Sequence, residues 1–118
     1  MASPYRYLHT MLRVGNLDRS VAFYRDLFDM VELRRRDVPD GKYTLSFMGY
    51  ADQPDQTELE LTYNYGVDTY DLGAGFGHLA IGMPDVYAAC DKLRAAGVAV
   101  GRSTAVLGCG FARRSAAC

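Results

Sequence analysis

The two histidines of the chain, His9 and His78, each open a run of residues with the alternating pattern of a β-strand. A third such run, residues 58–64, places Glu60 on a polar face opposite two leucines. Alternate residues of a strand share a face. Two imidazole nitrogens and one carboxylate suit a divalent transition ion such as Ni, Zn, Fe or Co, and they leave coordination positions for water or substrate. The three residues are therefore candidate metal ligands, if the fold brings them together.

Two further polar residues follow these candidates at a fixed distance. Arg13 lies four residues after His9, and Asn64 lies four residues after Glu60. Four residues keep the same strand face and cover about 13 Å. A guanidinium group can bind a ligand carboxylate through two parallel hydrogen bonds, and an amide offers both a donor and an acceptor. Arg13 and Asn64 are therefore candidate contacts to a ligand held near the metal.

Each of these residues also has an ordinary structural interpretation. A single histidine on a strand is usually a satisfied structural residue, a lone outward-facing glutamate is usually solvated, and a single arginine usually lies on the surface. Spacing alone does not decide between the two interpretations. The metal site is favoured because both histidines occupy the equivalent position of a repeated unit.

The first half of the chain predicts the element order β-α-β-β-β. Asn16 or Asp18 can cap the helix, whose apolar residues follow helical spacing, and residues 39–41 (PDG) are typical of a turn. The expected strands cover residues 7–14, 31–36, 42–48 and 58–64, and the expected helix covers about 17–28.

The pattern then begins again at an offset of 69 residues, which aligns His9 with His78 and Asn16 with Asp85. A strand is expected over residues 77–83, then a helix that ends near Gly97, then a strand from residue 98. This repetition indicates a duplicated supersecondary unit. We expect an α+β fold of paired βαβββ modules in a single domain over residues 1–118, with module one at about 5–66 and a partial module two at about 76–118.

The end of the second copy does not follow the pattern. Residues 103–118 show no alternation and are rich in Ala, Arg, Gly, Ser and Cys. The counterpart of Glu60 would fall beyond residue 118. The hypothesis is that the C-terminus is truncated or derives from a shifted reading frame.

Composition narrows the class of protein. A length of 118 residues fits one domain, and the net charge of −1 offers no basic surface for nucleic acid or anionic membranes. No apolar run approaches the ~20 residues of a membrane span, and residues 1–4 lack the apolar core of a signal peptide. The three cysteines form neither a CxxC motif nor an even set. A cytoplasmic protein is expected.

Four runs of the sequence closely resemble glyoxalase I, the lactoylglutathione lyase family of the vicinal-oxygen-chelate superfamily. The resemblance covers about residues 5–102. The runs are residues 8–14 (LHTMLRV), 17–24 (LDRSVAFY), 60–68 (ELTYNYGVD) and 77–81 (GHLAI).

The resemblance implies a metal-dependent isomerisation of the methylglyoxal–glutathione hemithioacetal to S-lactoylglutathione, which detoxifies methylglyoxal. It implies that His9, Glu60 and His78 are metal ligands, and that Glu60 is also the catalytic base. It implies that Arg13 and Asn64 contact the glutathione part of the substrate, which His78 would also approach. The short spacing between motifs resembles the nickel-preferring branch, so nickel is the first expectation and zinc the second. A homodimer with sites between subunits is implied as well.

The chain departs from the family pattern in its second half. A fourth ligand, a glutamate on the last strand of the second module, has no counterpart, because no acidic residue follows Asp91. The lysine-bearing loop that closes over glutathione is also missing, because Lys92 is the last lysine. Weak or no activity is therefore expected. Two alternatives are a His-His-Glu iron ring-cleaving dioxygenase and a non-catalytic small-molecule-binding module of the same superfamily.

Overall fold

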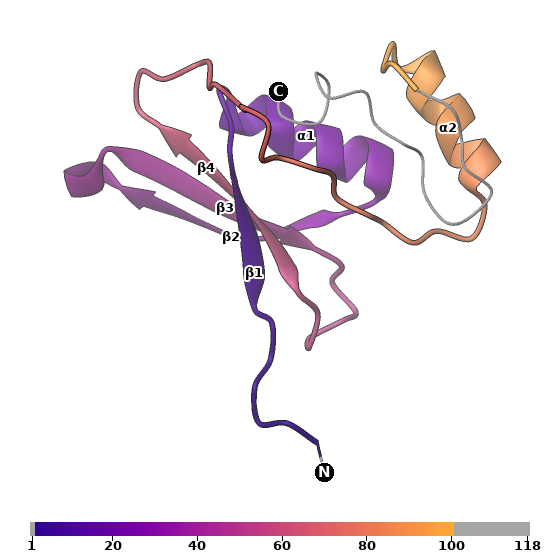
Figure 1. Ribbon diagram of the computed structural model, residues 1–118, viewed down its shortest axis with the longest axis horizontal. Coiled ribbons are helices and arrows are strands. Elements are labelled where there is room, and N and C mark those ends of the chain that lie inside the picture. Colours follow the sequence, from indigo (N-terminus) through magenta and orange to yellow (C-terminus); the bar gives the residue numbers. More distant parts are fainter. Residues whose placement is uncertain (1, 101–118) are drawn as a thin grey trace. The chain divides into compact units, whose positions relative to one another are not determined.

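The computed structural model describes residues 2–100, and the chain divides into two compact units, residues 1–70 and 71–118 (Figure 1). The tail over residues 103–118, which the sequence predicts to be truncated or frameshifted, lies outside the described residues. Single-domain organisation over residues 1–118 stays a prediction. Within residues 2–100, no helix has the length and apolar character needed to cross a membrane.

The first unit has the predicted element order β-α-β-β-β, with a short 3-10 helix between the second and third strands. Helix α1 begins one residue after Asn16, whose side-chain Oδ1 accepts a hydrogen bond from the backbone N–H of Arg19 at 3.0 Å. Asn16 rather than Asp18 is thus the cap. The elements are β1 (His9–Arg13), α1 (Leu17–Phe28), β2 (Val31–Val38), the 3-10 helix (Pro39–Gly41), β3 (Tyr43–Gly49) and β4 (Glu58–Asn64).

The four strands form one mixed sheet in the order β1-β4-β3-β2. Strands β1 and β4 are parallel, while β4 with β3 and β3 with β2 are antiparallel. The register pairs His9 with Glu58 and Met11 with Glu60. The first and last strands of the unit are therefore neighbours, although residues 14–57 of the chain separate them.

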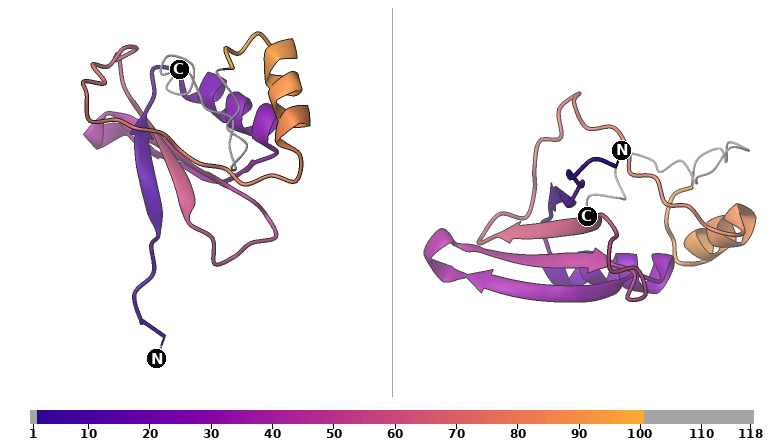
Figure 2. Two further views of the ribbon diagram at one scale, coloured as in Figure 1. Left: turned by 45° about the vertical axis from the view of Figure 1, so that its right-hand side comes forward. Right: turned by 90° about the horizontal axis from the view of Figure 1, so that it is seen from below.

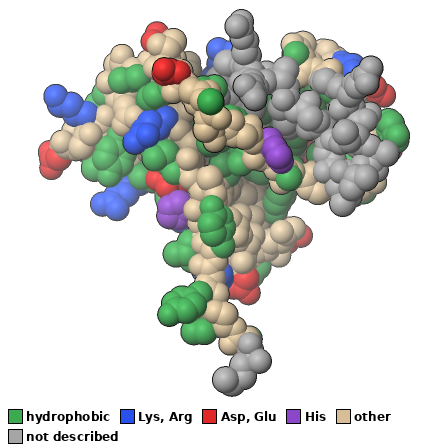
Figure 3. Space-filling view, viewed as in Figure 1, with side chains coloured by type: hydrophobic (Ala, Val, Ile, Leu, Met, Phe, Trp, Pro, Cys, Tyr) green, Lys and Arg blue, Asp and Glu red, His purple; other side chains and the backbone are tan. Residues whose placement is uncertain are grey.

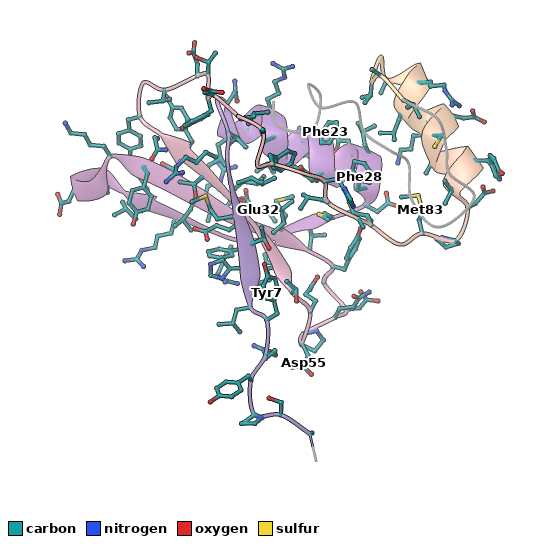
Figure 4. All side chains as sticks on the ribbon, viewed as in Figure 1. Tyr7, Phe23, Phe28, Glu32, Asp55 and Met83 are labelled. Atoms are coloured by element: carbon teal, nitrogen blue, oxygen red, sulfur yellow. The ribbon has the colours of Figure 1, made fainter. Side chains whose placement is uncertain are left out.

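Helix α1 covers one face of this sheet and forms the core with it. Its buried positions include Val21, Tyr24 and Phe28, and the sheet contributes Met48 and Leu61, which are both fully buried. The ring of Phe28 lies 5.6 Å from the ring of Phe23 on the same helix (Figure 4). Burial of these apolar side chains is the main source of stability for the unit. The opposite face of the sheet, which we call the open face, carries the candidate site residues.

A β-bulge in β2 places Glu32 and Arg34 on opposite faces of the sheet. Glu32 pairs with Met48, but Arg34 pairs with Phe47, so Leu33 is the extra residue. On the helix-covered face, Glu32 accepts a hydrogen bond from Ser46 at 2.7 Å. Without the bulge, Arg34 would share that face with Glu32, because residues two apart in a regular strand point the same way.

The second unit contains the predicted helix, α2 (Val86–Ala95). The Asp85 side chain accepts a hydrogen bond from the backbone N–H of Ala88 at 3.0 Å, and Gly97 after the helix has a φ of 79°, in the left-handed region that suits glycine. The expectation of a strand over residues 77–83 is wrong, because the ribbon before α2 carries no strand arrow (Figure 2). Val100 forms only an isolated bridge. A strand needs a neighbour for its backbone hydrogen bonds, and residues 71–100 contain no other strand.

Candidate metal and substrate site

The centre of the candidate site is a contact between His9 on β1 and Glu60 on β4. The imidazole Nε2 lies 3.0 Å from the carboxylate Oε2. The Glu60 side chain is 13% exposed and that of His9 is 42% exposed, so the pair is sheltered on one side and open to solvent on the other. The parallel β1–β4 pairing creates this contact by placing both residues on the open face. An imidazole nitrogen and a carboxylate oxygen at this separation are donors that fit a divalent transition ion.

A second carboxylate, Glu58, lies on the same strand face but has a different partner. Arg34 donates two hydrogen bonds to it, from Nη1 to Oε1 at 2.9 Å and from Nη2 to Oε2 at 2.7 Å. These hydrogen bonds lower the pKa of Glu58 below its ordinary value. Glu58 therefore stays ionised and occupied by Arg34, and Glu60 is the carboxylate that faces the imidazole.

An aromatic ring lies between these two pairs. Phe47 on β3 contacts His9 edge to face, with ring centroids 5.5 Å apart and an interplanar angle of 84°. The guanidinium carbon of Arg34 lies 3.8 Å from the centroid of the same ring. Figure 3 shows acidic, basic and histidine side chains close together beside β1. One ring thus contacts both a residue of the candidate ligand pair and the arginine that binds Glu58.

Arg13 and Asn64 lie on the open face, beyond His9 and Glu60 respectively. Because β1 and β4 are parallel, both residues are displaced from the ligand pair in the same direction along the sheet. The Asn64 amide nitrogen donates a hydrogen bond to the Tyr70 hydroxyl oxygen at 3.0 Å. A ligand that extends from the His9–Glu60 pair along the strands would therefore reach both.

His78 belongs to the second unit, so its role as third metal ligand stays a prediction, as do the roles of Arg13 and Asn64. Among residues 2–100, no group of three His, Cys, Asp or Glu side chains is gathered closely enough to hold a metal ion. The described site is accordingly a pair of potential ligands.

A family model places this fold among known proteins. Residues 6–111 match the model described as the Glyoxalase/Bleomycin resistance protein/Dioxygenase superfamily. The chain belongs to this superfamily. The match confirms the glyoxalase fold class, and the relatives described next confirm the resemblance of the four sequence runs to glyoxalase I.

Relatives within the superfamily are more specific. The chain is 56% identical over 90 residues to the lactoylglutathione lyase of Haemophilus influenzae, covering 76% of this chain and 67% of that protein. It is 53% identical over 87 residues to the probable lactoylglutathione lyase of Synechocystis, covering 74% of this chain and 66% of that one. The chain thus spans about two thirds of the length of these relatives.

Solved structures of this superfamily agree with the fold. The trypanothione-dependent glyoxalase I of Leishmania major has a TM-score of 0.80 and 47% sequence identity, covering 85% of this chain and 72% of that one. Glyoxalase I of Zea mays has a TM-score of 0.77 and 48% identity, covering 82% of this chain and 34% of that one.

Sequence reasoning missed Arg34 and Phe47 as residues of the site. Alternation correctly grouped Glu58 with Glu60, but it could not say which face of β3 would lie under α1. It also could not place Arg34, because the bulge at Leu33 reverses the alternation of β2. The only available signal was the charge complementarity between Arg34 and the acidic face of β4.

Proposed function

We propose that this chain is a lactoylglutathione lyase, which converts the hemithioacetal of methylglyoxal and glutathione into S-lactoylglutathione. The observation that carries the proposal is the approach of His9 Nε2 to Glu60 Oε2 at 3.0 Å on the open face of the sheet. Support also comes from relatives named lactoylglutathione lyase or probable lactoylglutathione lyase, which are 50–56% identical to this chain over the 87–92 aligned residues.

The proposed metal ligands are His9, Glu60 and His78, with nickel as first choice and zinc as second. A bound divalent ion would supply Lewis acidity for the negative charge that develops on the substrate oxygens. Glu60 would remove the proton from the substrate carbon and return a proton to the adjacent carbon, so the reaction is an isomerisation without redox change. The partial shelter of Glu60 keeps bulk water from one side of this proton transfer.

Arg13 and Asn64 are the proposed contacts to the glutathione part of the substrate, alongside His78. The Arg13 guanidinium group would bind a substrate carboxylate. Tyr70 accepts a hydrogen bond from the Asn64 amide nitrogen, and it would thereby direct the amide oxygen of Asn64 toward an N–H of the peptide. The same displacement of both residues along parallel strands supports one extended ligand. A homodimer with sites between subunits and a cytoplasmic location complete the proposal.

The test is metal analysis by mass spectrometry together with a hemithioacetal assay on the purified chain. We expect one bound divalent ion per chain and weak formation of S-lactoylglutathione that stops when a chelator removes the metal. Absence of both bound metal and product after incubation with nickel and with zinc would contradict the proposal. No described contact favours the iron dioxygenase or the non-catalytic module, and the named relatives favour the lyase.

A further inference from the structure

An unbroken series of contacts runs across the open face from Glu58 to His9. Arg34 holds both oxygens of Glu58, at 2.9 and 2.7 Å. Its guanidinium group lies over the Phe47 ring at 3.8 Å, and the ring meets the His9 imidazole at 5.5 Å. The three strands β2, β3 and β4 thus act on the orientation of one imidazole on β1.

This series contributes little to stability in itself. The Arg34 side chain is 55% exposed, and ion pairs in such exposed positions typically contribute little to stability. Its geometry is nevertheless restrictive. Two parallel hydrogen bonds fix the plane of the guanidinium group, and a cation over an aromatic face limits where the ring can move. The contacts therefore restrict the orientation of the Arg34 and Phe47 side chains more than they stabilise the fold.

The register of the sheet shows why orientation matters here. His9 lies directly opposite Glu58, while Glu60 lies opposite Met11. Directly opposed residues of neighbouring strands are the nearest side-chain neighbours across a sheet. Glu58 is therefore the carboxylate that the imidazole would meet first. The imidazole instead contacts Glu60, and both oxygens of Glu58 accept hydrogen bonds from Arg34.

We propose that Arg34 is a positioning residue that withholds Glu58 from His9 and, through Phe47, holds the imidazole with Nε2 directed toward Glu60. The bulge at Leu33 is what brings Arg34 to the open face, because regular alternation would place it with Glu32 on the other side. The consequence for metal binding rests on the proposed function, whereas the orientation of His9 does not.

The test compares Arg34→Met with Arg36→Met in the full chain. Arg36 is on the same strand two residues further, opposite Leu45, and is exposed on the same open face, so its substitution is a matched control. Two measurements are made. Proton NMR of the metal-free protein reports the cross-relaxation between the His9 and Phe47 rings, and competition with a chromogenic chelator gives the Kd for Ni²⁺.

We expect Arg34→Met to weaken the His9–Phe47 cross-peak and to raise the Kd for Ni²⁺ roughly 10- to 100-fold, the range found for residues that orient metal ligands. Arg36→Met should leave the cross-peak unchanged and the Kd within about twofold. Arg34→Lys keeps the charge but lacks the planar fork, so it should give an intermediate Kd.

A double variant, Arg34→Met with Glu58→Gln, tests the withholding of Glu58 directly. Removing the competing carboxylate should restore a large part of the nickel affinity that Arg34→Met loses. An unchanged cross-peak in Arg34→Met, or no recovery in the double variant, would overturn the inference. If the unsubstituted chain binds no metal but the cross-peak still weakens in Arg34→Met, the proposed function fails while the positioning role stands.

Discussion

The two units of the chain begin with the same local signals, but only one of them forms a sheet among the described residues. Asn16 caps α1 and Asp85 caps α2, each by accepting a backbone hydrogen bond at 3.0 Å from the residue three positions further. The first unit adds four paired strands, whereas residues 71–100 contain a helix and no strand.

This difference separates local from long-range determinants of structure. A helix satisfies its backbone through hydrogen bonds to residues four positions away, so its capping and apolar signals lie within one short segment. A strand depends on partners that can be distant in sequence. His9 contacts Glu60 because β4 lies beside β1. Residues 77–83 carry the alternation of a strand, but the described part of the second unit offers them no neighbour.

The largest effect is expected from removing the Glu60 carboxylate, which contacts His9 in the first unit. Glu60→Gln keeps the shape of the side chain but removes a proposed metal ligand and base. We expect the hemithioacetal isomerisation rate to fall roughly 10²- to 10⁴-fold, measured by steady-state kinetics with added nickel. Glu58→Gln, two residues away on the same strand face, should lose much less. Equal losses in the two variants would contradict the assignment of Glu60.

Amide hydrogen exchange compares the backbone of the two units directly. The amides of β4 pair with β1 on one side and β3 on the other, so they should exchange at least roughly 100-fold more slowly than those of residues 77–83, which form no strand. Exchange measured by mass spectrometry after peptic digestion resolves these segments. Similar protection in both segments would show that residues 77–83 pair with another strand in solution.

Each helix carries a tyrosine, and the two tyrosines differ in their burial. Tyr24 on α1 is 3% exposed, and burial raises its pKa to about 12 from the ordinary 10.0, while Tyr87 on α2 is 70% exposed. Folding favours the neutral phenol of Tyr24, so its contribution is complete below pH 10 and is lost as the pH rises toward 12. We expect the free energy of unfolding to fall by up to about 3 kcal/mol over that interval.

Urea unfolding followed by circular dichroism at a series of alkaline pH values measures this fall. Tyr24→Phe should reduce the slope, because the substituted residue cannot ionise. Tyr87→Phe is the matched control and should leave the slope unchanged. The same slope in both variants would mean that other groups cause the alkaline loss of stability.

The smallest expected effect comes from the two helix caps. Asn16→Ala should lower the free energy of unfolding of the first unit by about 1 kcal/mol, because the Arg19 N–H loses its side-chain acceptor. Asp85→Ala should instead raise the exchange rate of amides within α2 and leave the amides of β4 unaffected. Chemical denaturation and hydrogen exchange distinguish these results. A loss of protection in β4 caused by Asp85→Ala would show that the two units unfold together.

The sequence was sufficient to predict most of the first unit because its signals agree with one another. The strand boundaries of β4, the cap at Asn16 and the apolar spacing of α1 all lie in short segments. The contact between His9 and Glu60 was also predictable, since both residues had been placed on polar strand faces of one module.

The other features depend on which strands pair and in what register, and a single sequence does not show this. The bulge at Leu33 is visible only as a shift in register between β2 and β3, so the position of Arg34 could not be predicted. The prediction of a strand over residues 77–83 was wrong because it also depended on pairing. Its alternation was present, but alternation alone does not supply a hydrogen-bonding neighbour.

The pairing of β1 with β4 gives metal binding a mechanical consequence. His9 and Glu60 are 51 residues apart in sequence, so an ion held by both would crosslink the first and last strands of the unit. An ion that binds the folded form and not the unfolded chain stabilises the folded form by mass action, so it disfavours opening. The supply of metal in the surroundings would then set how long the unit survives proteolysis, independently of any turnover.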